Sequence, residues 1–259
     1  MDLVENGILN KTQNIHPWEL VRLGVIASNV AKIAEDISIP VSLIDIGCGD
    51  AFVISNLQKQ FKFESFHAVD INFTSTQIDQ LKKEYPKIDF HSDLKEVEIS
   101  PKRAYILLLN DVIEHIEADH DFIDFLKATV IDKCENVSLF ITVPAFQFVF
   151  SSHDIDLGHY RRYTLGQVLK YNDALKMQIT SKGYFFTSLL MVRFLQRIIS
   201  FKKPEASKGN IGIAGWNHGK VVTNVFILIL KTDLFFTRSL ALVGIKIPGL
   251  STFAVFRKK

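Results

Sequence analysis

The chain has 259 residues, of which 47% are hydrophobic, and this size suits one large α/β domain with a sizeable core. Its formal net charge is only +2, so no strong field would collect nucleic acid, and we expect no nucleic-acid partner. The sequence holds no run of about 18 to 20 apolar residues, which is the length that a membrane-spanning helix needs.

The first half of the chain alternates helical and strand periodicity. An amphipathic helix is predicted over 16–36, because apolar residues recur every three or four positions and Pro17 suits the first turn. The predicted strands that follow are 41–46, 66–69, 88–91, 104–109 and 137–143, and the predicted helices between them are 50–61, 74–85 and 118–132. This alternation is typical of a doubly wound, mostly parallel sheet with helices on both faces, which binds ligands at the carboxyl ends of its strands.

The second half of the chain is less regular. Thr164 and Gln167 form a capping pair for a helix that ends near Leu175. Segments 178–186 and 251–256 are predicted as a closing pair of strands at one edge, which makes the expected sheet seven-stranded. Between them, helical patterns at 191–198 and 221–242 flank a polar, glycine-containing loop over 202–218.

The expected organisation is a single domain over 1–259. Residues 1–40 are predicted to form an N-terminal helical lid, although an ordinary packing helix is the alternative. Residues 41–164 form the ligand-binding core. Residues 165–259 form a C-terminal part with a helical insertion at 187–245 and the closing strands.

The strongest local signal is a glycine turn after the first predicted strand. Gly47 and Gly49 follow an apolar run, and a ligand can approach such a turn closely. A dinucleotide site usually has a third glycine where this chain has Phe52. Asp45 stands two residues before the first glycine, where its charge would oppose a pyrophosphate. The turn therefore favours a ligand with a positive end.

A second acidic residue, Asp70, ends the second predicted strand. It lies 21 residues after Gly49, where the acidic residue of nucleoside-binding sheets accepts hydrogen bonds from the ribose hydroxyls. S-adenosylmethionine combines a ribose with a positive charge. The alternative is a surface turn with a strand-end aspartate that caps a helix.

These motifs resemble those of the class I S-adenosylmethionine-dependent methyltransferases, and the resemblance covers about 41–164. It implies the Rossmann-like methyltransferase fold, S-adenosylmethionine as cofactor and S-adenosylhomocysteine as product. It also implies that the glycine turn wraps the methionine part, that Asp70 holds the ribose and that Asp93 meets the adenine, unless Asp93 is only a helix cap. The cofactor-binding residues implied are Asp45, Gly47, Cys48, Gly49, Asp70, Ile71, Asp93, Leu94, Asn110 and Asp111.

The acceptor side is predicted from two segments that follow the fourth and fifth strands. The segment 110–116 resembles the one that closes over the cofactor in this family, and the loop 152–164 is rich in histidine, arginine and tyrosine. Imidazoles exchange protons near neutral pH, and arginines bind carboxylate or phosphate. The catalytic candidates are His115, His153, His159 and Tyr160, and the substrate-binding candidates are Glu114, Arg161, Arg162, Tyr163 and Trp18.

Structural alternatives remain for both acceptor segments. Glu114 and His115 would also serve as a solvated pair that opens a helix. The arginines would also pair with Asp154 and Asp156 and simply hold the loop. If they instead bind substrate, the acceptor is anionic.

The predicted activity is methyl transfer to a small-molecule acceptor or to a lipid- or sugar-linked one. The alternatives are a catalytically silent cofactor-binding subunit, a membrane-surface module and a nicotinamide-dependent oxidoreductase. The apolar C-terminal segments suit the core, a homodimer contact or peripheral attachment to a bilayer. Cys48 and Cys134 suggest neither a disulfide nor a metal site, and the acidic, polar N-terminus does not resemble a signal peptide, so we expect a cytoplasmic protein, or one at the inner face of a membrane.

Overall fold

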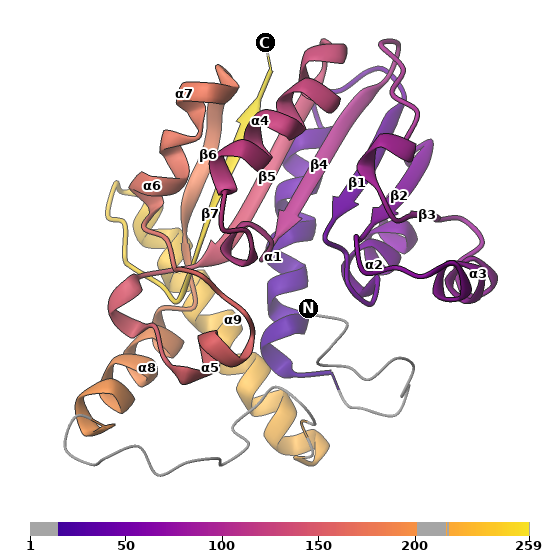
Figure 1. Cartoon of the computed structure of the whole chain (residues 1–259). Helices are drawn as coiled ribbons and strands as arrows, with labels where there is room; N and C mark the ends of the chain where they lie inside the picture. The colour runs from indigo at the N-terminus through magenta and orange to yellow at the C-terminus, as the bar shows by residue number, and fades with distance from the viewer. Residues whose placement is uncertain (1–14, 201–215, 217, 259) are drawn as a thin grey trace.

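A seven-stranded sheet with strand order β3-β2-β1-β4-β5-β7-β6 forms the centre of the computed structural model, which describes residues 15–200, 216 and 218–258 (Figure 1). The parallel strands are β1 (Val41–Ile46), β2 (Ser65–Val69), β3 (Asp89–His91), β4 (Ala104–Asn110) and β5 (Val137–Pro144). The edge pair β6 (Gln178–Phe185) and β7 (Ser251–Arg257) is antiparallel. The doubly wound sheet and its closing pair are therefore confirmed.

Helices cover both faces of this sheet. The helices on one face are α1 (Pro17–Ala34), α2 (Phe52–Gln60) and α3 (Ser75–Glu84), and those on the other are α4 (Asp119–Thr129), α6 (Leu165–Lys170) and α7 (Asn172–Leu175). A third group lies beyond the carboxyl ends of the parallel strands, at the bottom of Figure 1: α5 (Ser152–Asp156), α8 (Thr187–Ser200) and α9 (Lys220–Leu242).

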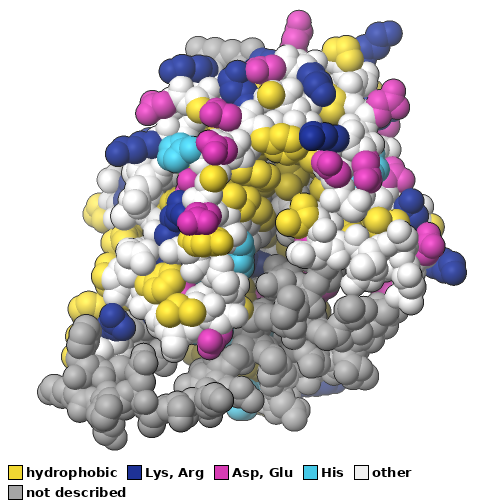
Figure 2. All heavy atoms as spheres, viewed as in Figure 1, with side chains coloured by type: hydrophobic (Ala, Val, Ile, Leu, Met, Phe, Trp, Pro, Cys, Tyr) yellow, Lys and Arg dark blue, Asp and Glu magenta, His cyan; other side chains and the backbone are white. Residues whose placement is uncertain are grey.

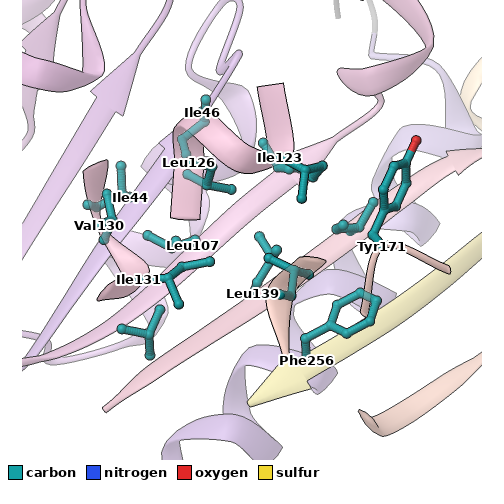
Figure 3. Close-up of a cluster of buried hydrophobic side chains, with 14 of the residues drawn as sticks. Ile44, Ile46, Leu107, Ile123, Leu126, Val130, Ile131, Leu139, Tyr171 and Phe256 are labelled. Atoms are coloured by element: carbon teal, nitrogen blue, oxygen red, sulfur yellow. The ribbon is translucent and has the colours of Figure 1, made fainter. Parts of the chain in front are cut away.

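The residues of strand β4 require that both faces of the sheet are covered. All seven of its residues are buried, because side chains of a strand alternate between the two faces and here each face packs on helices. Leu107 belongs to the cluster that contains Ile123 and Leu126 of α4 (Figure 3). Its neighbour Leu108 belongs to the opposite cluster, with Ile26 of α1. The continuous apolar run in the sequence is thus a central strand buried on both sides.

Helix α3 begins as the sequence predicts. Thr74 accepts a hydrogen bond from the backbone N–H of Gln77, whose side-chain oxygen accepts one from the backbone N–H of Thr74. Thr164 and Gln167 repeat this capping box at the start of α6. The helix predicted to end near Leu175 is divided into α6 and α7, and the loop predicted over 202–218 lies mostly outside the described residues.

Helices α8 and α9 form the insertion between β6 and β7. Leu230 of α9 and Phe186 pack on Val21 and Val25 of α1, which joins the insertion to the first half of the chain. Within the described ranges, none of the helices has both the length and the apolarity that a membrane crossing requires. The first turns of α1 reach this cluster while its later turns pack on the sheet. We propose that the N-terminal turns of α1 serve as the lid part of the domain.

Replacing Leu107 by alanine should lower the free energy of unfolding by about 2–5 kcal/mol, because its side chain is fully buried and a cavity would remain. Urea unfolding measures this change. Leu242→Ala is the matched control, since Leu242 is 89% exposed and its truncation should change stability by less than about 0.5 kcal/mol. Equal effects of the two substitutions would contradict the assignment of β4 as the central strand.

Candidate active site

A cavity of about 1020 Å³ opens at the carboxyl ends of β1, β2, β4 and β5, where the strand order reverses. Figure 2 shows hydrophobic side chains in a hollow near the centre of the view, with charged side chains around it. The volume is at the upper end of what small-molecule sites offer. Helices α1, α5, α8 and α9 supply much of the remaining wall through residues such as Trp18, His153, Leu189 and Phe226.

The glycine turn forms one end of this cavity. Gly47 has a φ of 69° and Gly49 a φ of 56°, both in the left-handed region that favours glycine. A Cβ on Gly47 would lie 2.7 Å from Cγ2 of Val112, so a side chain there would meet the segment after β4. The backbone N–H of Gly47 donates to the carbonyl oxygen of Val69 at 2.8 Å. The turn therefore brings its backbone to the cavity and fixes it against β2.

Asp70 links the turn to the end of β2. Its Oδ2 accepts a hydrogen bond from the backbone N–H of Gly49, and its Oδ1 accepts one from Asn72, each at 3.0 Å. A carboxylate oxygen has two acceptor positions, so each retains one that a ligand hydroxyl can use. Asp70 and the 87% exposed Ile71 both line the cavity.

Asp45 and Asn110 lie beneath the cavity and do not line it. Asn110 donates from Nδ2 to Oδ1 of Asp45 at 3.4 Å, and both residues are buried. Within the described residues, Oδ2 of Asp45 and Oδ1 of Asn110 have no hydrogen-bond partner. Burial raises the pKa of Asp45 to about 7, although Asn110 and Arg22 partly oppose this shift. These acceptors form an electron-rich floor for a ligand that donates hydrogen bonds.

The remaining predicted cofactor residues divide into two groups. Asp93 and Leu94 line the cavity, and Asp93 also caps a short 3-10 helix by accepting from the backbone N–H of Lys95 at 2.9 Å. Cys48 and Gly49 do not line it; they shape the turn, and burial raises the pKa of the Cys48 thiol.

Asp111 is held by an arginine that sequence reasoning missed. The Arg22 guanidinium of α1 forms an ion pair with Oδ2 of Asp111, and both residues line the cavity. Asp111 itself has a φ of 54°, and its Oδ1 accepts from Thr142 at 3.3 Å. The guanidinium also lies 4.8 Å from the centre of the Trp18 ring. Arg22 thus fixes the predicted lid helix to the segment after β4.

The two predicted acceptor segments meet as expected. The backbone N–H of Tyr160 donates to the carbonyl oxygen of Glu114 at 2.8 Å. The rings of His115 and His159 are 4.6 Å apart in an edge-to-face arrangement. Both histidines, Glu114 and His153 line the cavity. Burial raises the pKa of Glu114 well above its ordinary value and lowers that of His153.

Asp154 organises the histidine-rich loop. Its fully buried carboxylate accepts from Nε of Arg162 at 2.7 Å and contacts Nδ1 of His159 at 3.1 Å. Despite burial, these hydrogen bonds and the Arg162 charge hold the pKa of Asp154 well below its usual range. Arg162 lines the cavity. Its ion pair with Asp154 nevertheless matches the structural alternative, in which an arginine pairs with a nearby aspartate and holds the loop.

Three predicted acceptor-side residues do not line the cavity. Tyr160 is 52% exposed, beside the guanidinium of Arg161. Arg161 pairs with Asp119 at 3.1 Å, and the hydroxyl of Tyr163 donates to that carboxylate at 2.6 Å. Arg161 and Tyr163 anchor the loop to α4, because the Asp119 carboxylate of that helix takes up their polar groups.

Apolar and basic residues of the cavity wall were missed by sequence reasoning. Phe122 and Phe125 of α4 line the cavity and also pack, partly buried, against the core cluster that contains Ile123 and Leu126. The spacing of such apolar residues predicts a buried helix face, but it does not distinguish a cavity wall from the core. The other missed wall residues include Phe186, Val192, Arg193, Gln196 and Leu250.

Comparison with known proteins supports the fold. No family model matches the chain, and neither does any curated protein. A SAM-dependent methyltransferase from Archaeoglobus fulgidus is 14% identical with a TM-score of 0.51, over 91% of this chain and 94% of its own. Phosphoethanolamine N-methyltransferase 2 from Haemonchus contortus, solved with S-adenosyl-L-methionine, is 14% identical with a TM-score of 0.50, over 90% of this chain and 52% of its own.

This chain therefore spans about half the length of the Haemonchus contortus enzyme, which has also been solved with phosphomonomethylethanolamine and S-adenosylhomocysteine. The fold of the chain is that of the S-adenosylmethionine-dependent methyltransferases, which confirms the fold that the sequence motifs implied.

The raised pKa of Asp45 predicts a pH effect on stability. Since its pKa rises from 3.8 to about 7 on folding, the protonated carboxyl favours the folded state at low pH, and this contribution is lost as the pH rises through 7. The free energy of unfolding of the wild type, relative to Asp45→Asn, should therefore fall by on the order of 4 kcal/mol between about pH 4 and pH 8. Urea unfolding across this range tests it, and a constant difference would contradict it.

Proposed function

We propose that this protein transfers the methyl group of S-adenosylmethionine to an acceptor with an apolar part. The observation that carries this proposal is the cavity at the switch point of a methyltransferase fold, with a left-handed glycine turn at one end. Asp70, whose two oxygens both retain an acceptor position beside that turn, suits a ribose diol. Asp93 and Leu94, at the end of the next strand, suit the adenine.

The charge of the site suits a cationic ligand. The buried oxygens that have no hydrogen-bond partner within the described residues include acceptors on Asp45, Asn110 and Glu114. A ligand that brings an ammonium or sulfonium group compensates such a floor, whereas the pyrophosphate of a nicotinamide cofactor would be repelled. Asp45 acts without lining the cavity, and Gly47 gives the ligand access to the backbone.

The acceptor is proposed to bind between α5, α8 and the segment after β4. Phe186, Leu189 and Val192 give this side an apolar wall, and His153 and Arg193 give it polar groups. Methyl transfer from a sulfonium depends mainly on aligning nucleophile, methyl carbon and sulfur, so these walls act by orienting the acceptor. A lipid-linked acceptor with a polar or anionic head fits this combination.

The exposed face of helix α8 supports the proposal that the protein binds its acceptor at a membrane surface. Arg193 and Gln196 line the cavity, whereas Phe194, Leu195 and Ile198 on the opposite side are 47%, 56% and 45% exposed. Helix α9 adds exposed apolar residues next to basic ones: Val221, Val225, Leu228, Phe235, Phe236, Lys220, Lys231 and Arg238. Its acidic residue, Asp233, is bonded to Ser188. An apolar face with basic flanks is the pattern of helices that bind anionic bilayers.

Calorimetry should show that S-adenosylhomocysteine binds and that NAD does not. Asp70→Ala should weaken binding at least about 10-fold, because it removes two charge-assisted acceptors next to the ligand. Asp89→Ala is the control, since Asp89 is an exposed aspartate on the adjacent strand. Binding of NAD without S-adenosylhomocysteine would instead favour an oxidoreductase.

Vesicle flotation tests the proposed membrane surface. The wild type should float with vesicles that contain anionic lipid, and Phe194→Glu with Ile198→Glu should abolish flotation by placing charges on the exposed apolar face of α8. Thr76→Glu with Gln80→Glu is the control, because it adds the same charge to exposed positions of α3. If the wild type stays in solution as a dimer, the face is a contact between copies. Flotation without methyl transfer to any lipid or sugar acceptor would favour a non-catalytic membrane module.

A further inference from the structure

A carboxylate and two imidazoles converge on the acceptor side of the cavity. Glu114 and His115 come from the segment after β4, and His159 comes from the loop after α5. One ligand atom of each lies within 4.8 Å of the other two. We propose that these three side chains bind a divalent transition-metal ion.

The environment of Glu114 is the first support for this site. Its side chain is fully buried, and neither carboxylate oxygen has a hydrogen-bond partner in the described part of the chain. A buried carboxylate without a partner carries a large desolvation cost, which a bound cation compensates. The neighbouring Asp111 cannot supply that compensation, because it is itself an anion paired with Arg22.

The orientation of His159 is the second support. Asp154 contacts Nδ1 of His159 at 3.1 Å, so the tautomer that donates from Nδ1 to Asp154 presents Nε2 as the ligand atom. Asp154 is in turn fixed by Arg162 and by the backbone N–H of Ser151 at 2.9 Å. A carboxylate behind a histidine is the usual outer support of a metal ligand, because it fixes the ring and increases its basicity.

The ligand set indicates the kind of metal. Two imidazoles and one carboxylate suit Zn²⁺, Fe²⁺, Co²⁺ or Ni²⁺ better than Mg²⁺ or Ca²⁺, which prefer oxygen ligands. Tetrahedral zinc places its ligand atoms about 3.3 Å apart, so the three atoms must approach each other from their present spacing. His115 is half-buried, so we expect its ring to rotate toward Glu114 while Asp154 holds His159 in place.

Three protein ligands leave a coordination position for another molecule. All three side chains line the cavity, so this position faces the proposed acceptor space. A metal there would bind an acceptor oxygen and lower its pKa, which favours acceptors with a hydroxyl, carboxylate or phosphate oxygen next to the methylated atom. This last step rests on the proposed methyl transfer, whereas binding of the metal does not.

Titration of the full chain with Zn²⁺, followed by calorimetry and by the absorption of bound Co²⁺, tests the site. One ion should bind per chain. Glu114→Gln and His159→Ala should each weaken binding at least about 10-fold. Loss of a residue that only supports a metal ligand already costs about 10-fold, and these substitutions remove the ligands themselves. His91→Ala is the control for adventitious binding, because His67 and His91 form a separate pair with ring nitrogens 3.3 Å apart. Thermal unfolding verifies that each variant is folded.

The metal site would be overturned if binding is weak and disappears in His91→Ala. It would also be overturned if binding survives in both Glu114→Gln and His159→Ala. Binding of S-adenosylhomocysteine is measured on the same wild-type sample. If S-adenosylhomocysteine binds and Zn²⁺ does not, the metal site fails while the proposed function stands. If Zn²⁺ binds and S-adenosylhomocysteine does not, the proposed function fails while the metal site stands.

Discussion

The parallel pairing of β1 with β4 is the constraint on which the rest of the site depends. Its register places Ile46 beside Leu109, so the glycine turn and the segment after β4 leave the sheet next to each other. Val112 then fills the space that a side chain on Gly47 would need. The chain adds β2 and β3 on one side of β1, and β4 and β5 lie on its other side. The connections after β1 and β4 therefore run in opposite directions, and a crevice opens between them.

The sequence predicts the sheet and the glycine turn beside the cavity, because both depend on local signals. Apolar strands, capping boxes and a glycine turn are each encoded within a few residues, and Asp70 is placed by the end of its own strand. The ion pair of Arg22 with Asp111 shows where this stops. The two residues are 89 positions apart, and nothing in the pattern of the first helix distinguishes Arg22 from any solvent-facing arginine. Only the packing of α1 on the sheet brings it to the cavity.

The loop after β5 is conspicuous in the sequence, but the sequence does not predict the role of each of its side chains. Its histidines, arginines and tyrosines are conspicuous in the sequence, and the prediction that it meets the segment after β4 is correct in space. The role of each side chain, however, is decided by partners on other elements. Asp119 of α4 takes Arg161 and Tyr163 away from the cavity, while Asp154 turns His159 toward it. Composition therefore identifies the loop, and tertiary contacts divide it into structural anchors and cavity residues.

The buried carboxyl of Asp45 has a consequence for ligand uptake. With a pKa of about 7 it exchanges its proton near neutrality, and the proton competes with any cation that binds above the floor. Linkage then requires that entry of a cationic ligand expels a proton to solvent, so the measured heat of binding contains the ionisation enthalpy of the buffer. A carboxyl that never touches the ligand would in this way make the occupancy of the cavity depend on the acidity of its surroundings.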